Sequence, residues 1–264
     1  MLFTDSVYLN IAILTAGLLF VTWISHSLVE RFIDPKTMQK FYSTSSVIFQ
    51  VAGSIAGIMQ AFVVVSFWND FQDISNSAHQ EVENITVTYR NISLLQDSQE
   101  KEKLLTSFKV YVVSVIKDEV VGHASGKTLN EKTQAYQNAY WDALKKLGPK
   151  IESPSDQSIY QSILTDSNAA AKLRQHRMNS VASSEAGLLW VVLIASALIV
   201  MLLMGTLSAG QKGRVYFFLC SVMAFIFSLM IAVSMDYSKP YEGTATISKS
   251  IYEELLIQAT QFFR

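Results

Sequence analysis

Residues 45–68 read SSVIFQVAGSIAGIMQAFVVVSFW, and residues 69–95 read NDFQDISNSAHQEVENITVTYRNISLL. The first stretch has no charged residue and is long enough to cross roughly 30 Å of hydrocarbon as a helix. The second stretch is polar, yet it contains no Pro or Gly that would stop a helix. Together they predict one uninterrupted helix of roughly 75 Å, at about 1.5 Å per residue, that leaves the membrane partway along.

One stripe of residues, spaced about 3.5 positions apart, runs through both stretches. Its members in the membrane half are Ser46, Gln50, Gly53, Gly57, Gln60 and Val64. Its members in the polar half are Phe67, Phe71, Ile74, Ala78, Glu81, Ile85, Thr88, Ile92 and Leu95. The stripe is small and polar where lipid surrounds it and mostly apolar where water does. Such a contrast is typical of a face turned toward protein or an aqueous lumen.

The whole chain predicts an all-α, polytopic membrane protein with four transmembrane helices and an extramembrane helical domain between spans two and three. Half of its 264 residues are hydrophobic. Apolar windows of membrane-spanning length occupy residues 8–24, 47–67, 187–207 and 215–235. The N-terminus lacks the basic region of a cleaved signal peptide, so we expect the first span to be retained.

The pattern divides the chain into four parts. Residues 1–68 hold the first two spans, and residues 69–185 form the helical domain that continues the long second helix. Residues 186–235 hold spans three and four, and residues 236–264 form a connector and a short helix. Within the helical domain, amphipathic patterns predict helices from about Ser98 to Gly122, from 129 to 148, and from about Ser155 into the third span.

With four spans, both termini and the helical domain share one side of the membrane, and the two short loops share the other. The loop side carries basic residues at high density: Arg31, Lys36, Lys40, Lys212 and Arg214. Basic residues in short loops favour the cytoplasm. This rule places the helical domain and the termini outside the cytoplasm.

Five stretches resemble the bacterial bestrophin-like membrane proteins, a family of unknown function named for its similarity to bestrophin anion channels. They are AFVVVSFWNDF at 61–71, EVENITVTYR at 81–90, FKVYVVSVIKDE at 108–119, KLRQHRM at 172–178 with LLW at 188–190, and MDYSKPYEGTATIS at 235–248. The sequence departs from the family pattern at Val82, Met178 and Tyr241 and in the spacing between Asp236 and Pro240. The resemblance implies a bacterial inner-membrane protein and, through the family's name, an ion channel.

In bestrophin channels the second span lines the pore, and the resemblance carries this role to the second span here. The pore-lining candidates are Ser46, Gln50, Gly53, Gly57, Gln60, Val64 and Phe67. Gln50 and Gln60 would offer amide dipoles to a partly dehydrated ion, and Val64 with Phe67 would form a hydrophobic constriction. The alternatives are that Gly53 and Gly57 only pack helices closely, and that the glutamines bond other helices of the same subunit.

A second set of candidates carries charge or forms a joint in the chain. Glu81 is the one ionised residue on the apolar half of the stripe, and Arg174 and Arg177 lie on the helix that returns to the membrane. We expect the arginines to form a paired buried charge with Glu81 or Glu83, with a direct role at an ion entrance as the alternative. After the fourth span, Asp236, Pro240 and Gly243 are expected to form a rigid turn.

The sequence contains no motif that would indicate enzyme activity or the binding of a cofactor or metal. No nucleophile elbow, zinc-protease motif, P-loop or Cys/His cluster is present, so we expect no enzyme activity, no cofactor and no metal. The formal net charge is −1, which gives no sign of nucleic acid as a partner. The expected partners are the lipid bilayer, further copies of the chain and an inorganic ion.

Two functions remain open. The first is a homo-oligomeric ion channel, with anions as the candidate ions, in which the second span lines the pore. The alternative is a membrane-anchored interaction, sensory or scaffold protein whose second span only mediates oligomerisation.

Overall fold

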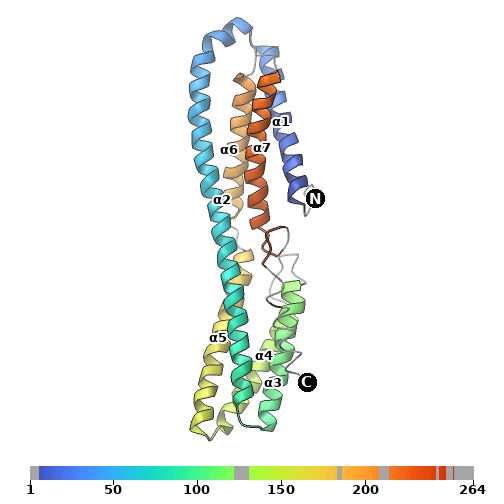
Figure 1. Ribbon diagram of the computed structural model, residues 1–264, viewed down its shortest axis with the longest axis vertical. Helices are drawn as coiled ribbons and strands as arrows, with labels where there is room; N and C mark the ends of the chain where they lie inside the picture. The colour runs from blue at the N-terminus through green and yellow to red at the C-terminus, as the bar shows by residue number, and fades with distance from the viewer. Residues whose placement is uncertain are drawn as a thin grey trace. The chain divides into compact units, whose positions relative to one another are not determined.

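The computed structural model describes residues 6–121, 131–182, 186–207, 214–241, 244–247 and 252. Within these ranges every regular element is helical, which confirms the predicted fold class. The α-helices are α1 (Val7–Phe32), α2 (Pro35–Leu94), α3 (Gln99–Ser114), α4 (Glu131–Leu147), α5 (Pro154–Ala182), α6 (Ala186–Leu207) and α7 (Arg214–Tyr237) (Figure 1). A π-helical turn, Val115–Val121, extends α3, and a short 3₁₀ turn, Gly148–Lys150, follows α4.

Helix α2 is one uninterrupted helix of 60 residues, as the sequence predicts. It begins at Pro35, about ten residues earlier than expected. Proline is favoured at the first helical position, where its missing N–H would have no partner in the helix and its fixed φ already suits the helix. Pro35 is therefore a favourable first residue for α2.

Among the described residues, four helices are long and apolar enough to cross a membrane. They are α1, the part of α2 that begins at Gln39, and the segments Gly187–Leu207 and Arg214–Tyr237 of α6 and α7. Their mean hydropathy over the best window lies between 1.9 and 2.8. These are the four spans that the apolar windows predict.

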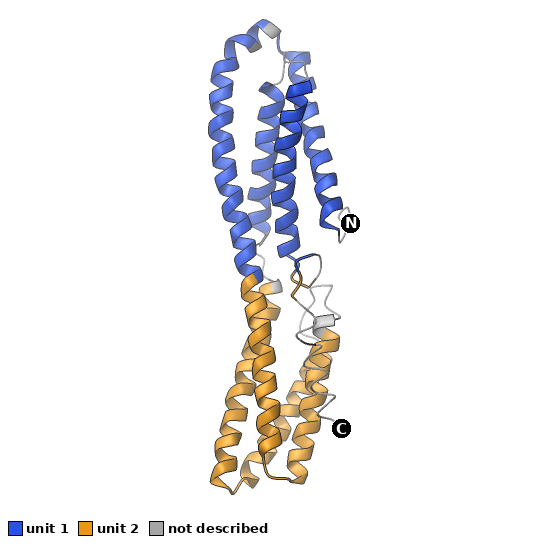
Figure 2. Ribbon diagram, viewed as in Figure 1, with its two compact units in different colours: residues 1–71, 184–239, 243–245 blue, residues 72–183, 240–242, 246–264 orange. Residues whose placement is uncertain are grey.

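The chain forms two compact units, which Figure 2 colours separately. Unit 1 comprises residues 1–71, 184–239 and 243–245, and unit 2 comprises residues 72–183, 240–242 and 246–264. Residues of α2 contribute to both.

Unit 1 is a helical bundle of α1, the first part of α2, α6 and α7. Its core holds Phe67 of α2, Leu193 and Met201 of α6 and Phe227 of α7, each no more than 4% exposed. Many outward-facing residues are apolar as well, for example Phe62, Leu188 and Phe217, which are at least 65% exposed. An apolar exterior around an apolar core is what a bundle immersed in lipid requires.

Helices α1 and α6 are in close contact at Gly205. A Cβ added there would lie 2.6 Å from the Cβ of Ser25 and 2.6 Å from the backbone oxygen of Thr22. The hydroxyl of Ser25 also donates a hydrogen bond of 2.8 Å to the backbone oxygen of Leu202. Small residues at such crossings let membrane helices pack backbone against backbone.

Unit 2 packs α3, α4, α5 and the second part of α2 around an apolar core. Leu104, Leu144 and Ile163 are fully buried. The ring of Tyr140 packs against Phe108 at 5.1 Å between centroids, and its hydroxyl lies 2.6 Å from the Ser167 hydroxyl. At the start of α3 the Ser98 hydroxyl accepts a hydrogen bond from the Lys101 backbone N–H, so Ser98 is the N-cap of this helix.

The close approach at Gly205 gives a test of the bundle. Gly205→Ala should lower the free energy of unfolding by about 1–3 kcal/mol, because the added methyl overpacks the contact with α1. Thermal unfolding of the detergent-solubilised protein measures the effect. Gly187→Ala is the matched control on the same helix, since an added Cβ there meets no atom within 4 Å. Equal stability of the two variants would contradict this packing.

Candidate functional site

The membrane part of α2 does not present all seven pore-lining candidates on one surface. Ser46, Gly53 and Val64 are half-buried, and Gln50 and Gly57 are exposed. Gln60 and Phe67 are buried, with 1% and 3% of their surface exposed. Five candidates therefore remain on or near the outer face of the helix, and two point into the bundle.

Gln60 is held by α6 of the same chain. Its side-chain N–H₂ donates to the backbone oxygen of Leu193 and to the hydroxyl of Ser196, both at 3.3 Å. Its Oε1 atom is buried without a hydrogen-bond partner among the described residues. For Gln60, this geometry agrees with the alternative interpretation of the sequence, in which the membrane glutamines form hydrogen bonds to other helices of the same subunit.

Phe67 also packs inside the bundle. Its ring lies against Trp190 of α6, with 5.1 Å between the centroids. Residues spaced 3.5 positions apart do not stay on one face of a straight helix, which has 3.6 residues per turn. Some members of the stripe therefore face α6, as Gln60 and Phe67 do, and others face outward.

The outer face of α2 carries a strip of small and polar residues between large apolar ones such as Ile55 and Ile58, which are 53% and 59% exposed. Gln50, Ser54 and Gly57 are exposed, and a Cβ added at Gly53 or Gly57 would meet no atom within 4 Å. Within the described ranges, neither glycine packs closely against another helix.

In the polar half of α2, the structure buries the predicted stripe. Ile74, Ala78, Ile85 and Ile92 are at most 4% exposed. Glu81 lies on the same face and is 1% exposed. The prediction that this face is turned toward protein is confirmed, and the protein it meets is the chain's own unit 2.

Glu81 forms a buried ion pair with Arg177 of α5. The Arg177 Nε donates to Glu81 Oε2 at 2.8 Å, and its Nη2 donates to Glu81 Oε1 at 3.3 Å. Both side chains are 1% exposed. This two-bond geometry fixes the carboxylate relative to the guanidinium.

Two tyrosines complete the cluster around this pair. The Arg177 Nη1 donates to the Tyr241 hydroxyl at 3.2 Å, and the Tyr252 hydroxyl donates to Glu81 Oε2 at 3.2 Å. The Arg177 guanidinium also lies about 6 Å from the centre of each tyrosine ring, within range of a cation–π attraction. We call Glu81, Arg177, Tyr241 and Tyr252 the charge cluster.

The electrostatics of the charge cluster keep both the arginine and the tyrosine protonated. Burial by itself lowers the pKa of Arg177, but the Glu81 carboxylate opposes it, and the net pKa lies well above the usual value. Burial and the same carboxylate raise the pKa of the Tyr252 phenol well above its usual value. The cluster therefore holds a fixed arrangement of charge over the physiological range of pH.

Arg174 occupies a separate buried position one turn earlier on α5. It is 2% exposed, and its Nη1 donates to Gln137 Oε1 of α4 at 3.0 Å. Its guanidinium lies 5.9 Å from the centre of the Tyr111 ring. The two arginines thus tie α5 to different neighbours.

The connector after α7 turns around Asp236. Its carboxylate accepts hydrogen bonds from the backbone N–H groups of Thr244 and Ala245, at 2.8 and 2.7 Å. Pro240 is buried, and its backbone oxygen accepts from the N–H of Ile247 at 2.8 Å. This is the bonding that a rigid turn requires; Gly243 lies outside the described residues.

Sequence reasoning missed the two tyrosines of the charge cluster and Gln137. Tyr241 stood out only as a departure from a family pattern that has Phe at this position. Tyr252 and Gln137 belonged to ordinary amphipathic patterns. The sequence of an amphipathic helix with many polar residues does not show which of those residues are buried.

Among the residues that the structure describes, no group of three or more His, Cys, Asp and Glu side chains gathers.

These features define the class of protein: a polytopic helical membrane protein with a buried charge cluster in its more polar unit. A sequence model of the Bestrophin-like domain matches residues 12–252. The chain therefore belongs to the bestrophin-like family, as its motifs suggested. No curated protein and no solved structure matches it significantly.

The charge cluster gives a second prediction. Arg177→Met should lower the free energy of unfolding by about 3–5 kcal/mol, because it leaves the Glu81 carboxylate buried without its partner. The double variant Glu81→Gln/Arg177→Met should recover part of this loss, since it buries no lone charge. Urea unfolding of the detergent-solubilised protein measures both.

The matched control for the charge cluster is an exposed ion pair on the same two helices. Asp73 Oδ2 lies 3.6 Å from His176 Nε2, and both side chains are at least half exposed. Asp73→Asn should cost at most about 1 kcal/mol. A single variant no worse than this control would show that the Glu81–Arg177 pair is unimportant for stability.

Proposed function

We propose that this protein is a homo-oligomeric ion channel in which the outer face of α2 lines the conduction path. The observation that carries the proposal is the strip of small and polar residues on that face, beside exposed apolar residues that suit lipid. Gln50, Ser54 and Gly57 are exposed there, and Gly53 and Gly57 have open space beside them. Exposing an amide to hydrocarbon is unfavourable, so association with further copies is the expected remedy.

The ion class follows from the groups on this face. No charged residue lies on it between Ser45 and Trp68, which argues against a proton relay. The side-chain N–H₂ of Gln50 can donate to a partly dehydrated anion. Membership in the bestrophin-like family supports anions as the first ions to test.

Val64 is the remaining candidate for a hydrophobic constriction. It is half-buried on the same side of the helix as Gly57 and Gln50. Phe67 no longer supports this role, because its ring packs on Trp190 inside the bundle. The proposed path therefore narrows at Val64 alone.

The two membrane glutamines make a matched pair for the test. Gln50→Leu should lower halide flux about tenfold or more, because a hydrogen bond to a charged partner is worth about 1.5–3 kcal/mol. Gln60→Leu should leave flux unchanged at equal amounts of folded protein, because Gln60 bonds α6 within its own chain. Halide and potassium gradients across liposomes that contain the purified protein provide the readout.

The competing function is an interaction or scaffold protein whose second span only mediates oligomerisation. The hydrogen bonds of Gln60 within one subunit favour it, because they remove one of the two polar groups that a pore would use. A folded, oligomeric sample without flux in either gradient would decide for the scaffold. Equal loss of flux in the two glutamine variants would refute the assignment of the outer face.

A further inference from the structure

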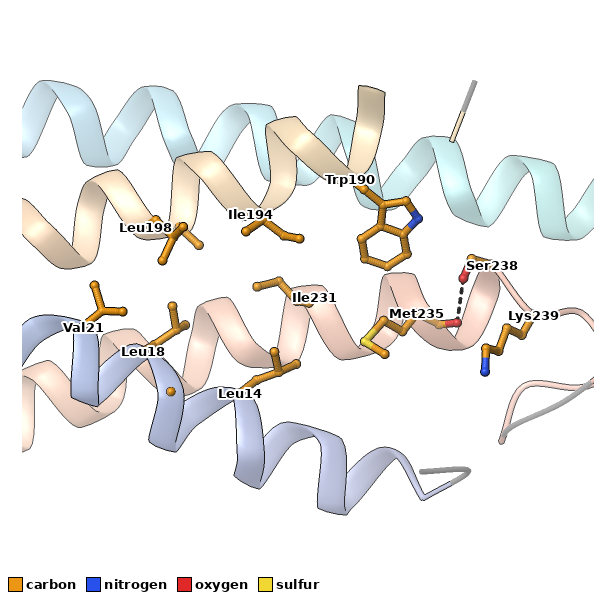
Figure 3. A pocket seen from close by; sticks show the side chains of 12 residues that line it. Leu14, Leu18, Val21, Trp190, Ile194, Leu198, Ile231, Met235, Ser238 and Lys239 are labelled. Atoms are coloured by element: carbon orange, nitrogen blue, oxygen red, sulfur yellow. Dashed lines mark hydrogen bonds between the residues drawn. The ribbon is translucent and has the colours of Figure 1, made fainter. Parts of the chain in front are cut away.

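A groove runs between α1, α6 and α7 of unit 1 (Figure 3). Its volume is about 520 Å³, within the range of about 300–1,000 Å³ that is usual for ligand pockets. Leu18 and Ala197 are buried in its lining, while Gly17 and Ile194 are exposed along it. It is therefore an open groove on the outside of the bundle.

The groove exists because α1 diverges from its neighbours. At Gly205 the backbones of α6 and α1 are in close contact. Toward its N-terminal end α1 moves away from α6 and α7 (Figure 3). Gly17 then leaves the space unfilled, since an added Cβ at this position meets no atom within 4 Å.

The chemistry of the groove changes along its length. Ten of its twelve lining residues are apolar, and the two polar ones, Ser238 and Lys239, lie together at one end just beyond α7. Trp190 lies near this end, and tryptophan is typical of the membrane–water interface. The Lys239 side chain is exposed, so a positive charge stands where the apolar channel opens.

The length of the groove matches one leaflet of a bilayer. Trp190 and Leu198 lie eight positions apart on α6, or about 12 Å along the helix axis. Half of a hydrocarbon core of about 30 Å is about 15 Å. A single acyl chain that enters from the interface fits this dimension.

We propose that this groove binds an anionic phospholipid, with one acyl chain between α1, α6 and α7 and the headgroup phosphate at Lys239. The apolar walls of α1, α6 and α7 contact the acyl chain on three sides. An acyl chain in the groove is therefore held more strongly than one in the surrounding lipid. The lysine selects a negatively charged headgroup over a zwitterionic one. The site does not involve the outer face of α2 and does not depend on whether the protein conducts ions.

Tryptophan fluorescence tests the proposal because Trp190 lines the groove. The full-length protein with Trp23, Trp68 and Trp141 each changed to Phe keeps Trp190 as the only tryptophan. It is reconstituted in phosphatidylcholine vesicles that contain a minor fraction of brominated phosphatidylglycerol or of brominated phosphatidylcholine. Bromine on the acyl chain quenches a tryptophan that it contacts, so quenching reports which lipid occupies the groove.

We expect brominated phosphatidylglycerol to occupy the groove about fivefold more readily than brominated phosphatidylcholine at the same fraction, the preference that one interfacial lysine confers. Lys239→Gln should abolish this preference. Lys172→Gln, which removes an exposed positive charge of α5 on the side of the membrane that the four-span topology also gives to Lys239, should preserve it. Equal loss in both lysine variants would mean general surface attraction and would overturn the proposal.

A second pair of variants tests the acyl-chain half of the site. Gly17→Phe should fill the groove and reduce quenching by both brominated lipids. Gly187→Phe, at another open glycine position outside the groove, should not. Equal quenching by the two lipids in the parent protein would show an ordinary lipid-facing surface, and no quenching by either would show that protein covers the groove. Either result would overturn the proposal.

Discussion

The constraint on which this structure depends is that one helix has to serve two environments along its 60 residues. The bilayer core offers no water to backbone polar groups, so the spanning part has to satisfy them within the helix. The polar part gains most by burying an apolar stripe in unit 2. Helix α2 meets both demands without a break because helical hydrogen bonds are made within the segment itself, whatever surrounds it.

The charge cluster of unit 2 follows from that burial. A carboxylate on the apolar stripe enters the protein interior, and a buried charge is tolerated only when it is paired and hydrogen-bonded. Arg177 supplies the charge and two of the hydrogen bonds, and Tyr252 supplies another. Such a pair adds little net stability compared with apolar residues, but either partner alone is costly. The cluster therefore fixes the register of α5 against α2 more than it strengthens the fold.

Polar groups in the membrane-spanning unit also need hydrogen-bond partners, but only some of them find one within the bundle. Gln60 turns inward and bonds the backbone of α6, whereas Gln50 and Gly57 are exposed on the outside of the residues that the structure describes. The core of this bundle is packed, but part of its surface exposes polar groups that hydrocarbon cannot satisfy. On another side of the same bundle, the divergence of α1 opens an apolar groove that ends at a lysine. We propose different partners for the two surfaces, a helix of a further copy for the first and a lipid for the second.

The sequence by itself determined the fold class, the four spans, the continuity of α2 and the buried stripe of its polar half, because these depend on local hydropathy and periodicity. The family motifs added the likeness to bestrophin-like proteins. Only the tertiary structure decided that Gln60 and Phe67 face inward, that Arg177 rather than Arg174 binds Glu81 in two hydrogen bonds, and that Tyr241 and Tyr252 join them. Periodicity places a residue on a face of a helix, but contacts between segments far apart in the chain determine what that face meets.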